Sequence, residues 1–148
     1  MATYTFEKSC GALVFRRGTG NDNSIYVLMI RHKLGGHRSF PKGHMEAGED
    51  EHMTAIREVA EETAVNIRIR SSFRETVKYS PAAGVMKEVV YFLAFTEQTA
   101  IHPREGEIAE VAWVPIDVAE QSLTHENDRI VFRAALKRIG SAHLVSEG

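Results

Sequence analysis

The chain has 148 residues, of which 43% are hydrophobic and 26% are charged, a composition typical of one globular domain. Its formal net charge of −2 argues against a general nucleic-acid-binding protein, because such proteins are usually basic overall. The single cysteine, Cys10, excludes an intrachain disulfide framework. The sequence has no signal-peptide pattern and no apolar run near the roughly 20 residues that cross a bilayer. We therefore expect a cytoplasmic protein without a membrane partner, with one domain over residues 1–148.

The first half of the chain predicts two strands, an irregular loop and a helix. Residues 10–16 and 25–31 are apolar and predict strands, and residues 18–24, rich in turn formers, predict a loop between them. Residues 33–42 contain two glycines and a proline and predict an irregular loop. Residues 50–64 have the length and periodicity of a helix.

The second half predicts further strands and a second helix. Residues 65–69 alternate apolar and polar side chains, residues 85–95 are apolar on both faces as in a central strand, and residues 111–114 form a short strand stopped by Pro115. Residues 125–139 predict a helix with Thr124 as N-cap and Gly140 as its C-terminal stop. This order predicts an α/β fold, a mixed sheet between helices, because it lacks the regular alternation of a Rossmann-like fold.

A row of carboxylates lies along one side of the predicted helix 50–64. Glu58, Glu61 and Glu62 fall within about 100° of arc, since they are spaced i, i+3, i+4. The row has no obvious local cationic partner, because Arg57 lies off this wedge. We expect the opposite side to pack on the sheet, and it carries Met53, Ile56, Ala60 and Thr63.

Two interpretations of the carboxylate row are open. Spacing alone favours a solvated acidic face, since exposed glutamates are common on helices. The preceding loop favours a metal site, because glycines allow a close backbone approach and the carbonyl of Gly43 would add an oxygen ligand. Clustered oxygen ligands suit Mg²⁺ or Mn²⁺ rather than zinc. Lys42 would then meet a phosphate oxygen as a point charge.

The segment 43–65 resembles the Nudix box, G-x5-E-x7-R-E-U-x-E-E-x-G-U, in which U is a bulky aliphatic residue. The one departure is Ala64, where the pattern has a glycine; it falls at the expected left-handed exit of the helix and costs on the order of 1 kcal/mol there. The matching positions are Gly43, Glu49, Arg57, Glu58, Val59, Glu61, Glu62 and Val65.

The resemblance implies a Nudix fold and metal-dependent hydrolysis of a nucleoside diphosphate linked to another group. It makes Glu58 and Glu62 the main metal ligands, with Glu61 assisting and the Gly43 carbonyl nearby. Mg²⁺, for which Mn²⁺ substitutes, would neutralise the phosphates and lower the pKa of a bound water.

Other roles within the box and beyond it are also implied. Arg57 and Glu49 would form an ion pair that orients the loop and the helix. Glu61, Glu62 and Glu107 are candidates for the base that takes the proton of the attacking water. Glu107 lies in the loop 103–108, where family members often place an acidic residue; an ordinary turn carboxylate is the alternative.

Weaker motifs are similar to those of asymmetrical diadenosine tetraphosphate hydrolases, which release ATP and AMP. They are residues 9–12, 40–44, 46–49, 78–79 and 87–92. The similarity implies that Tyr79 stacks on adenine and that Lys87 contacts phosphate, with ordinary packing as the alternative for Tyr79. His44 would either touch phosphate or brace the loop. The expected partner is a small nucleotide polyphosphate, with no stable nucleic-acid partner.

Other substrates and the oligomeric state, monomer or homodimer, remain open. The alternatives are house-cleaning hydrolysis of dNTPs or nucleotide sugars, hydrolysis of RNA 5′ ends or of diphosphoinositol phosphates, and a non-catalytic nucleotide-binding module. The intact Glu58, Glu61 and Glu62 disfavour the module.

Overall fold

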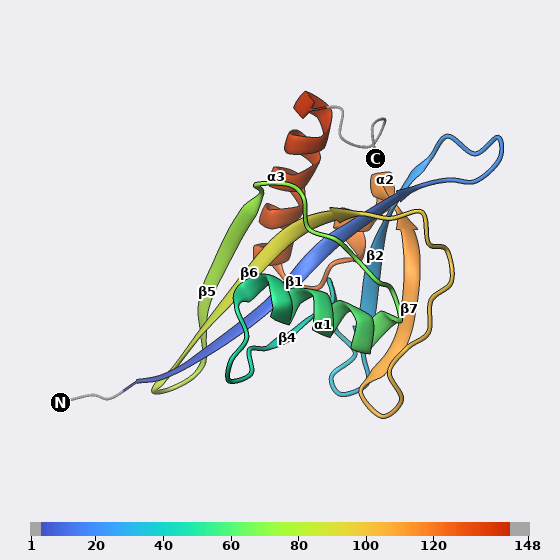
Figure 1. The fold of residues 1–148 in the computed structure, drawn as a ribbon. Coiled ribbons are helices and arrows are strands. Elements are labelled where there is room, and N and C mark those ends of the chain that lie inside the picture. The colour runs from blue at the N-terminus through green and yellow to red at the C-terminus, as the bar shows by residue number, and fades with distance from the viewer. Residues whose placement is uncertain (1–3, 143–148) are drawn as a thin grey trace.

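A computed structural model describes residues 4–142, which form a mixed β-sheet with helices on both faces (Figure 1). The strands are β1 (Thr5–Arg17), β2 (Ile25–His32), β3 (Arg38–Ser39), β4 (Lys42–His44), β5 (Arg74–Ala82), β6 (Val85–Phe95) and β7 (Ile108–Pro115). The helices are α1 (Glu51–Thr63), α2 (Ile116–Ser122) and α3 (Glu126–Ala142). The predicted α/β class is confirmed. Among the described residues, no helix is long and apolar enough to cross a membrane.

The sheet is built around the parallel pair β1 and β6. The strand order is β3-β2-β1-β6-β5, with β4 paired to β1 and β7 paired to β2. Every pairing other than β1–β6 is antiparallel. Residues 89–94 of β6 are all buried, which confirms the predicted central strand with both faces covered.

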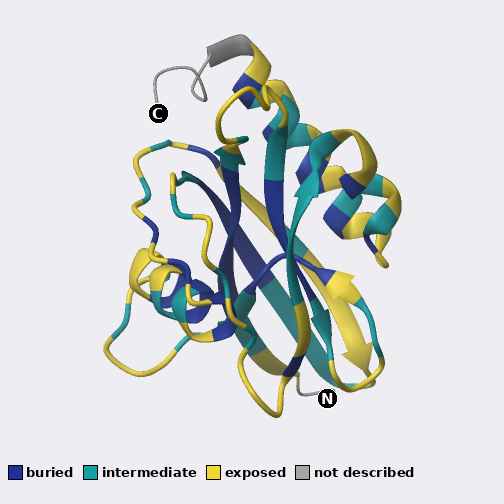
Figure 2. Cartoon of the chain, turned by 90° about the vertical axis from the view of Figure 1, so that its right-hand side faces the viewer, coloured by how far each residue is buried: buried dark blue, intermediate teal, exposed yellow. Residues whose placement is uncertain are grey.

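Two hydrophobic cores lie on the two faces of the sheet. Ala55 and Val59 of α1 pack in the core on one face, and Ala119 of α2 and Phe132 of α3 pack in the core on the other. Figure 2 shows the buried residues concentrated along the sheet and on the helix surfaces turned toward it. The helices therefore cover opposite faces because each buries its own apolar stripe against the sheet.

The α1 helix presents a different side to the sheet than its apolar pattern predicts. Its buried residues are Thr54, Ala55, Glu58, Val59, Glu62 and Thr63, which include two members of the carboxylate row. Met53 is 51% exposed and Ile56 is 37% exposed, so the prediction that they anchor the helix was wrong. Ala55 and Val59 pack in the core instead, and Glu58 and Glu62 are buried on the adjoining side of the helix.

Several other predicted elements differ from the structure. Residues 65–69 form no strand, although Val65 and Ile67 are buried beside α1. The short β3 lies within the predicted irregular loop. Strand β5 was missed because it is a largely exposed edge strand, and α2 because it has only seven residues. Strand β7 does end at Pro115.

The predicted ends of the last helix were also wrong. Helix α3 begins at Glu126, and the Thr124 hydroxyl accepts a hydrogen bond from the Arg38 N–H at 2.8 Å instead of capping the helix. The helix continues past Gly140 to Ala142. A single glycine in a helix costs only about 1 kcal/mol relative to alanine, which neighbouring contacts offset.

Replacing Ala64 by glycine should raise the free energy of unfolding by about 1 kcal/mol. Ala64 caps α1 with φ 65° and ψ 15°, and it is the single non-glycine residue with a positive φ among residues 4–142. Glycine adopts this conformation without the Cβ clash. Urea denaturation of the two proteins at one pH measures the difference. An unchanged or lower stability of the variant would contradict a strained cap.

Candidate active site

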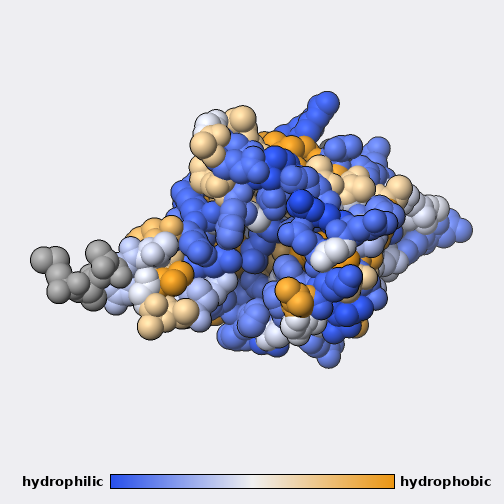
Figure 3. All heavy atoms as spheres, turned by 90° about the horizontal axis from the view of Figure 1, so that it is seen from below, coloured by the Kyte–Doolittle hydropathy of each residue, from blue (hydrophilic) through white to orange (hydrophobic). Residues whose placement is uncertain are grey.

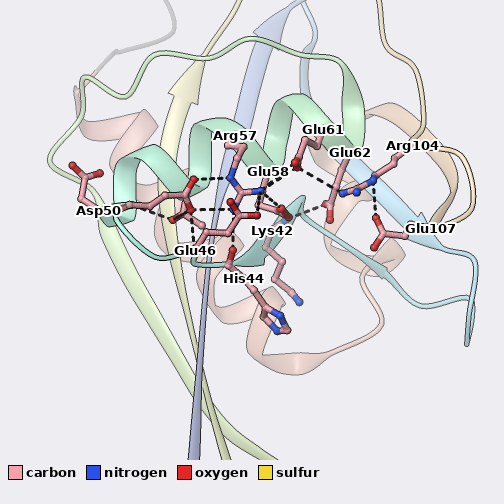
Figure 4. Close-up of polar contacts among 12 residues, drawn as sticks. Lys42, His44, Glu46, Asp50, Arg57, Glu58, Glu61, Glu62, Arg104 and Glu107 are labelled. Carbon is pink, nitrogen blue, oxygen red and sulfur yellow. Dashed lines mark hydrogen bonds and ion pairs between the residues drawn. The ribbon is translucent and has the colours of Figure 1, made fainter.

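Two buried carboxylates of α1 face strand β4. Glu58 and Glu62, one helical turn apart, are 8% and 6% exposed. The Lys42 N–H donates a hydrogen bond to Glu62 Oε1 at 3.1 Å, and a Cβ on Gly43 would overlap the Glu58 carboxylate. Figure 4 shows these groups beside one another between α1 and β4. Gly43 is therefore required for the backbone of β4 to approach the helix this closely.

The charge of these two carboxylates is poorly compensated. Burial raises the pKa of Glu62 to about 8, and the nearby Glu58 adds to the effect. Burial also raises the pKa of Glu58, although the Arg57 guanidinium opposes this shift. Burial and the neighbouring Lys87 lower the pKa of Lys42. A cation bound between Glu58 and Glu62 would stabilise their ionised forms.

Arg57 joins the carboxylates to the preceding loop. Its guanidinium binds both carboxylate oxygens of Glu49, at 2.6 and 3.0 Å, and donates to the His44 carbonyl at 2.9 Å. Its Nη1 lies 2.7 Å from Glu58 Oε1 and 3.0 Å from Glu61 Oε2. The expectation that the carboxylate row has no local partner was therefore wrong, because the long arginine side chain bends back to it.

Glu49 is held in its ionised form by this arrangement. Arg57 lowers the pKa of Glu49 to about 2, with help from the Glu46 N–H and the Thr54 hydroxyl, which donate to it. The ion pair ties the loop 45–50 to the first turns of α1. Arg57 therefore positions the loop and the Glu58 carboxylate.

The donor set fits a hard divalent cation. The carboxylates of Glu58, Glu61 and Glu62 and the carbonyl of Gly43 are oxygen ligands, which suit Mg²⁺ or Mn²⁺. Within residues 4–142, no three acidic, histidine or cysteine side chains already converge on one metal position. Arg57 Nη1 bridges Glu58 and Glu61 instead, so a bound ion would compete with the guanidinium for these two carboxylates.

An arginine–glutamate pair lies at the far end of the carboxylate row. Arg104 Nε is 3.0 Å from Glu107 Oε2, and Arg104 Nη1 is 3.7 Å from Glu61 Oε2 (Figure 4). Glu107 lies in the predicted loop, but β7 begins at Ile108, directly after it and earlier than predicted. Glu107 also contributes to the raised pKa of Glu62. Arg104 was missed in the sequence analysis, although its spacing of three residues from Glu107 was the available signal.

Lys42 and Tyr79 both line a cavity of about 280 Å³, whereas Glu58, Glu61 and Glu62 are not among its lining residues. Lys87 pairs with Tyr79 across β5 and β6. His44 is placed elsewhere: its side chain is 64% exposed and lies 4.0 Å from Glu7, and it does not line the cavity. Cavity residues that the sequence analysis missed include His37, Tyr91, His125 and Asp128.

Three imidazoles gather at the rim of this cavity. The rings of His32 and His37 stack at 3.9 Å, and His125 lies 5.6 Å from His37. Burial lowers the pKa of His32 to about 4, and that of His37 is also lowered. These two rings are therefore neutral near pH 7, and they offer flat aromatic surfaces beside the charged lysines. Hydrophilic residues dominate the surface seen from below (Figure 3).

Comparison with known proteins agrees with this fold. The family model of the NUDIX domain matches residues 6–135, and the chain therefore belongs to the Nudix family. The asymmetrical bis(5′-nucleosyl)-tetraphosphatase of Sus scrofa is 31% identical over 122 residues, which are 77% of this chain and 82% of that protein. The structure of a Caenorhabditis elegans Ap4A hydrolase binary complex superposes with a TM-score of 0.81 and 25% identity, covering 91% of this chain and 98% of that chain.

A second kind of relative is also similar. The 8-oxo-(d)GTP phosphatase of Mycolicibacterium smegmatis is 29% identical over 137 residues, which are 88% of this chain and 42% of that protein. The chain spans about half the length, 52% and 42%, of two mycobacterial relatives that it matches. The relatives therefore agree on the family and differ in their substrates.

Proposed function

We propose that this protein is a metal-dependent Nudix pyrophosphohydrolase that cleaves diadenosine tetraphosphate to ATP and AMP. The observation that carries the proposal is the position of Lys42. Its backbone N–H binds Glu62 at 3.1 Å, and the same residue lines the cavity that also contains Tyr79. One residue thus connects the candidate metal carboxylates to a candidate nucleoside subsite, as a substrate with a nucleoside and a polyphosphate chain requires.

Some of these residues would bind the metal and the phosphates, and others would transfer the proton. Glu58 and Glu62, with Glu61 and the Gly43 carbonyl, would hold Mg²⁺, which neutralises phosphate charge and lowers the pKa of a bound water. Lys42 and Lys87 would hold the phosphate chain as point charges. The water oxygen bonds to phosphorus, one P–O–P bond breaks, and the bridging oxygen leaves with the departing phosphate.

A carboxylate takes the proton of the attacking water. Glu61, Glu62 and Glu107 are the candidates, since Arg104 brings Glu107 to the same end of α1 as Glu61. Glu107 is 60% exposed, so it is accessible to solvent water. Glu107→Gln tests the base most directly, because Glu107 is not among the proposed metal ligands and loss of a general base costs about 10²–10⁴-fold in rate.

The substrate is tested with a panel of phosphate anhydrides. The protein is incubated with Mg²⁺ and, separately, with diadenosine polyphosphates, dNTPs, 8-oxo-dGTP, ADP-ribose, triphosphorylated RNA and a diphosphoinositol phosphate, and products are separated by ion-exchange chromatography. We expect equimolar ATP and AMP from the tetraphosphate, and no turnover when EDTA replaces Mg²⁺. Without turnover of any compound, the protein would be a nucleotide-binding module.

A house-cleaning activity is the second candidate. The similarity to an 8-oxo-(d)GTP phosphatase supports it. Release of a nucleoside monophosphate from 8-oxo-dGTP or another dNTP, with diadenosine tetraphosphate untouched, would favour this activity. That result would overturn the choice of substrate and leave the metal site as proposed.

A further inference from the structure

Asp128 places a buried carboxylate in the wall of the cavity. It is 7% exposed, lies in the first turn of α3 and lines the cavity together with Lys42 and Tyr79. Its Oδ1 accepts a hydrogen bond from the Tyr91 hydroxyl at 3.3 Å. Among residues 4–142 this is the sole hydrogen bond to the Asp128 side chain, so none of these residues donates to Oδ2.

This arrangement is unusual for an acidic residue at the start of a helix. Such residues usually lie in solvent, where they interact with the helix dipole or cap backbone N–H groups. No described backbone N–H donates to the Asp128 side chain, which turns inward instead. Burial raises the pKa of Asp128, whereas the nearby Lys42 favours its ionised form. Asp128 lines the cavity and its Oδ2 accepts no hydrogen bond from residues 4–142, so a ligand in the cavity can donate one to this atom.

The rest of the cavity wall is suited to a nucleobase. Tyr79 and His37 offer aromatic rings, and Val77 and Val89 offer apolar surface, which together favour a flat heterocycle over a phosphate or a ribose. The lysine that would hold phosphate lines the same cavity. A carboxylate in such a place accepts hydrogen bonds from base amines and is repelled by carbonyl oxygens.

We propose that Asp128 is a specificity residue that accepts a hydrogen bond from the exocyclic amine of an adenine base. This inference rests on the proposed function in taking the cavity as the nucleoside subsite. Tyr91 positions the carboxylate through its hydroxyl, and Oδ2 contacts the amine. A base with an oxygen in place of the amine is rejected, because two acceptors would face each other in a buried cavity.

The test measures binding of product-like nucleotides by calorimetry in EDTA, so that it needs no turnover. The ligands are AMP, IMP, which has an oxygen in place of the amine, and purine riboside monophosphate, which has a hydrogen there. The unaltered protein should bind AMP at least about 10-fold more tightly than either analogue. This comparison requires no variant and therefore does not depend on whether a variant folds.

The Asp128→Asn variant should abolish the preference. Its amide donates to the oxygen of IMP, so the ratio of AMP to IMP affinity should fall by about 10-fold or more. Asp117→Asn is the matched control, because it makes the same substitution at an exposed residue in the first turn of α2 that does not line the cavity. It should leave the ratio unchanged.

Two results would overturn the inference. Equal affinity of the unaltered protein for AMP and purine riboside monophosphate would show that no protein group recognises the amine. An unchanged ratio in a folded Asp128→Asn variant would show that Asp128 serves only its bond to Tyr91. Either result is distinct from failure of the proposed function, which would appear as absent hydrolysis of diadenosine tetraphosphate.

Discussion

Replacing Glu62 by glutamine should lower kcat of the Mg²⁺-dependent reaction by about 10²–10⁴-fold, the range for loss of a proton-transfer group. Glu62 lies at the centre of the site, 6% exposed, with its charge opposed by burial and by Glu58. Glutamine preserves the shape and the oxygen that accepts from Lys42 N–H, but it carries no negative charge for a cation. Steady-state kinetics with the tetraphosphate measures the loss.

The same substitution should stabilise the metal-free protein at high pH. The folded-state pKa of Glu62, about 8, is raised above its ordinary value of 4.5. The folded state therefore binds this proton more tightly, and the stability from it is fully present below about pH 4.5 and is lost as the pH rises through about 8. The variant lacks this loss, so its free energy of unfolding should exceed that of the unaltered protein by about 1 kcal/mol or more near pH 9.

Urea denaturation of both proteins in EDTA at about pH 5 and about pH 9 measures this pH-dependent difference in stability. Adding Mg²⁺ should stabilise the unaltered protein and have little effect on Glu62→Gln. Glu97→Gln, which removes an exposed carboxylate, is the control and should change neither kcat nor the pH dependence. A fully active Glu62→Gln variant would exclude Glu62 as ligand and as base.

Replacing Gly43 by alanine should reduce kcat/KM by about 10²-fold, since small displacements of reacting groups have effects of this size. The added Cβ would overlap the Glu58 carboxylate, which is the far end of a flexible side chain. Glu58 avoids the overlap by turning away, so the fold is kept and the ligand is displaced. Gly43 has no positive φ, and its backbone accepts alanine without strain.

The Gly43→Ala substitution should therefore affect activity much more than stability. Activity falls strongly, while the free energy of unfolding changes by about 1 kcal/mol or less. Gly140→Ala is the matched control, because a Cβ there meets nothing within 4 Å and the residue lies in α3. Full activity of Gly43→Ala would mean that the close approach of β4 to Glu58 is not needed for catalysis.

Local spacing along the chain determined the class of this protein. The pattern from Gly43 to Val65 depends on residues close together in sequence, and the spacing within its helix predicted the row that contains Glu58 and Glu62. The apolar stretches predicted β1, β2, β6 and β7 because strand propensity and burial reinforce each other there. The left-handed helix exit at Ala64 followed from the same pattern and is confirmed.

Only the tertiary structure decided which side of α1 is buried and what forms the cavity. Periodicity assigns apolar residues to the core, but α1 buries Glu58 and Glu62 and leaves Met53 exposed, because β4 approaches the helix at Gly43. The cavity joins residues far apart in sequence, such as Lys42 and Asp128, through strand pairing and helix packing. No local pattern reports such contacts, since they depend on the path of the whole chain.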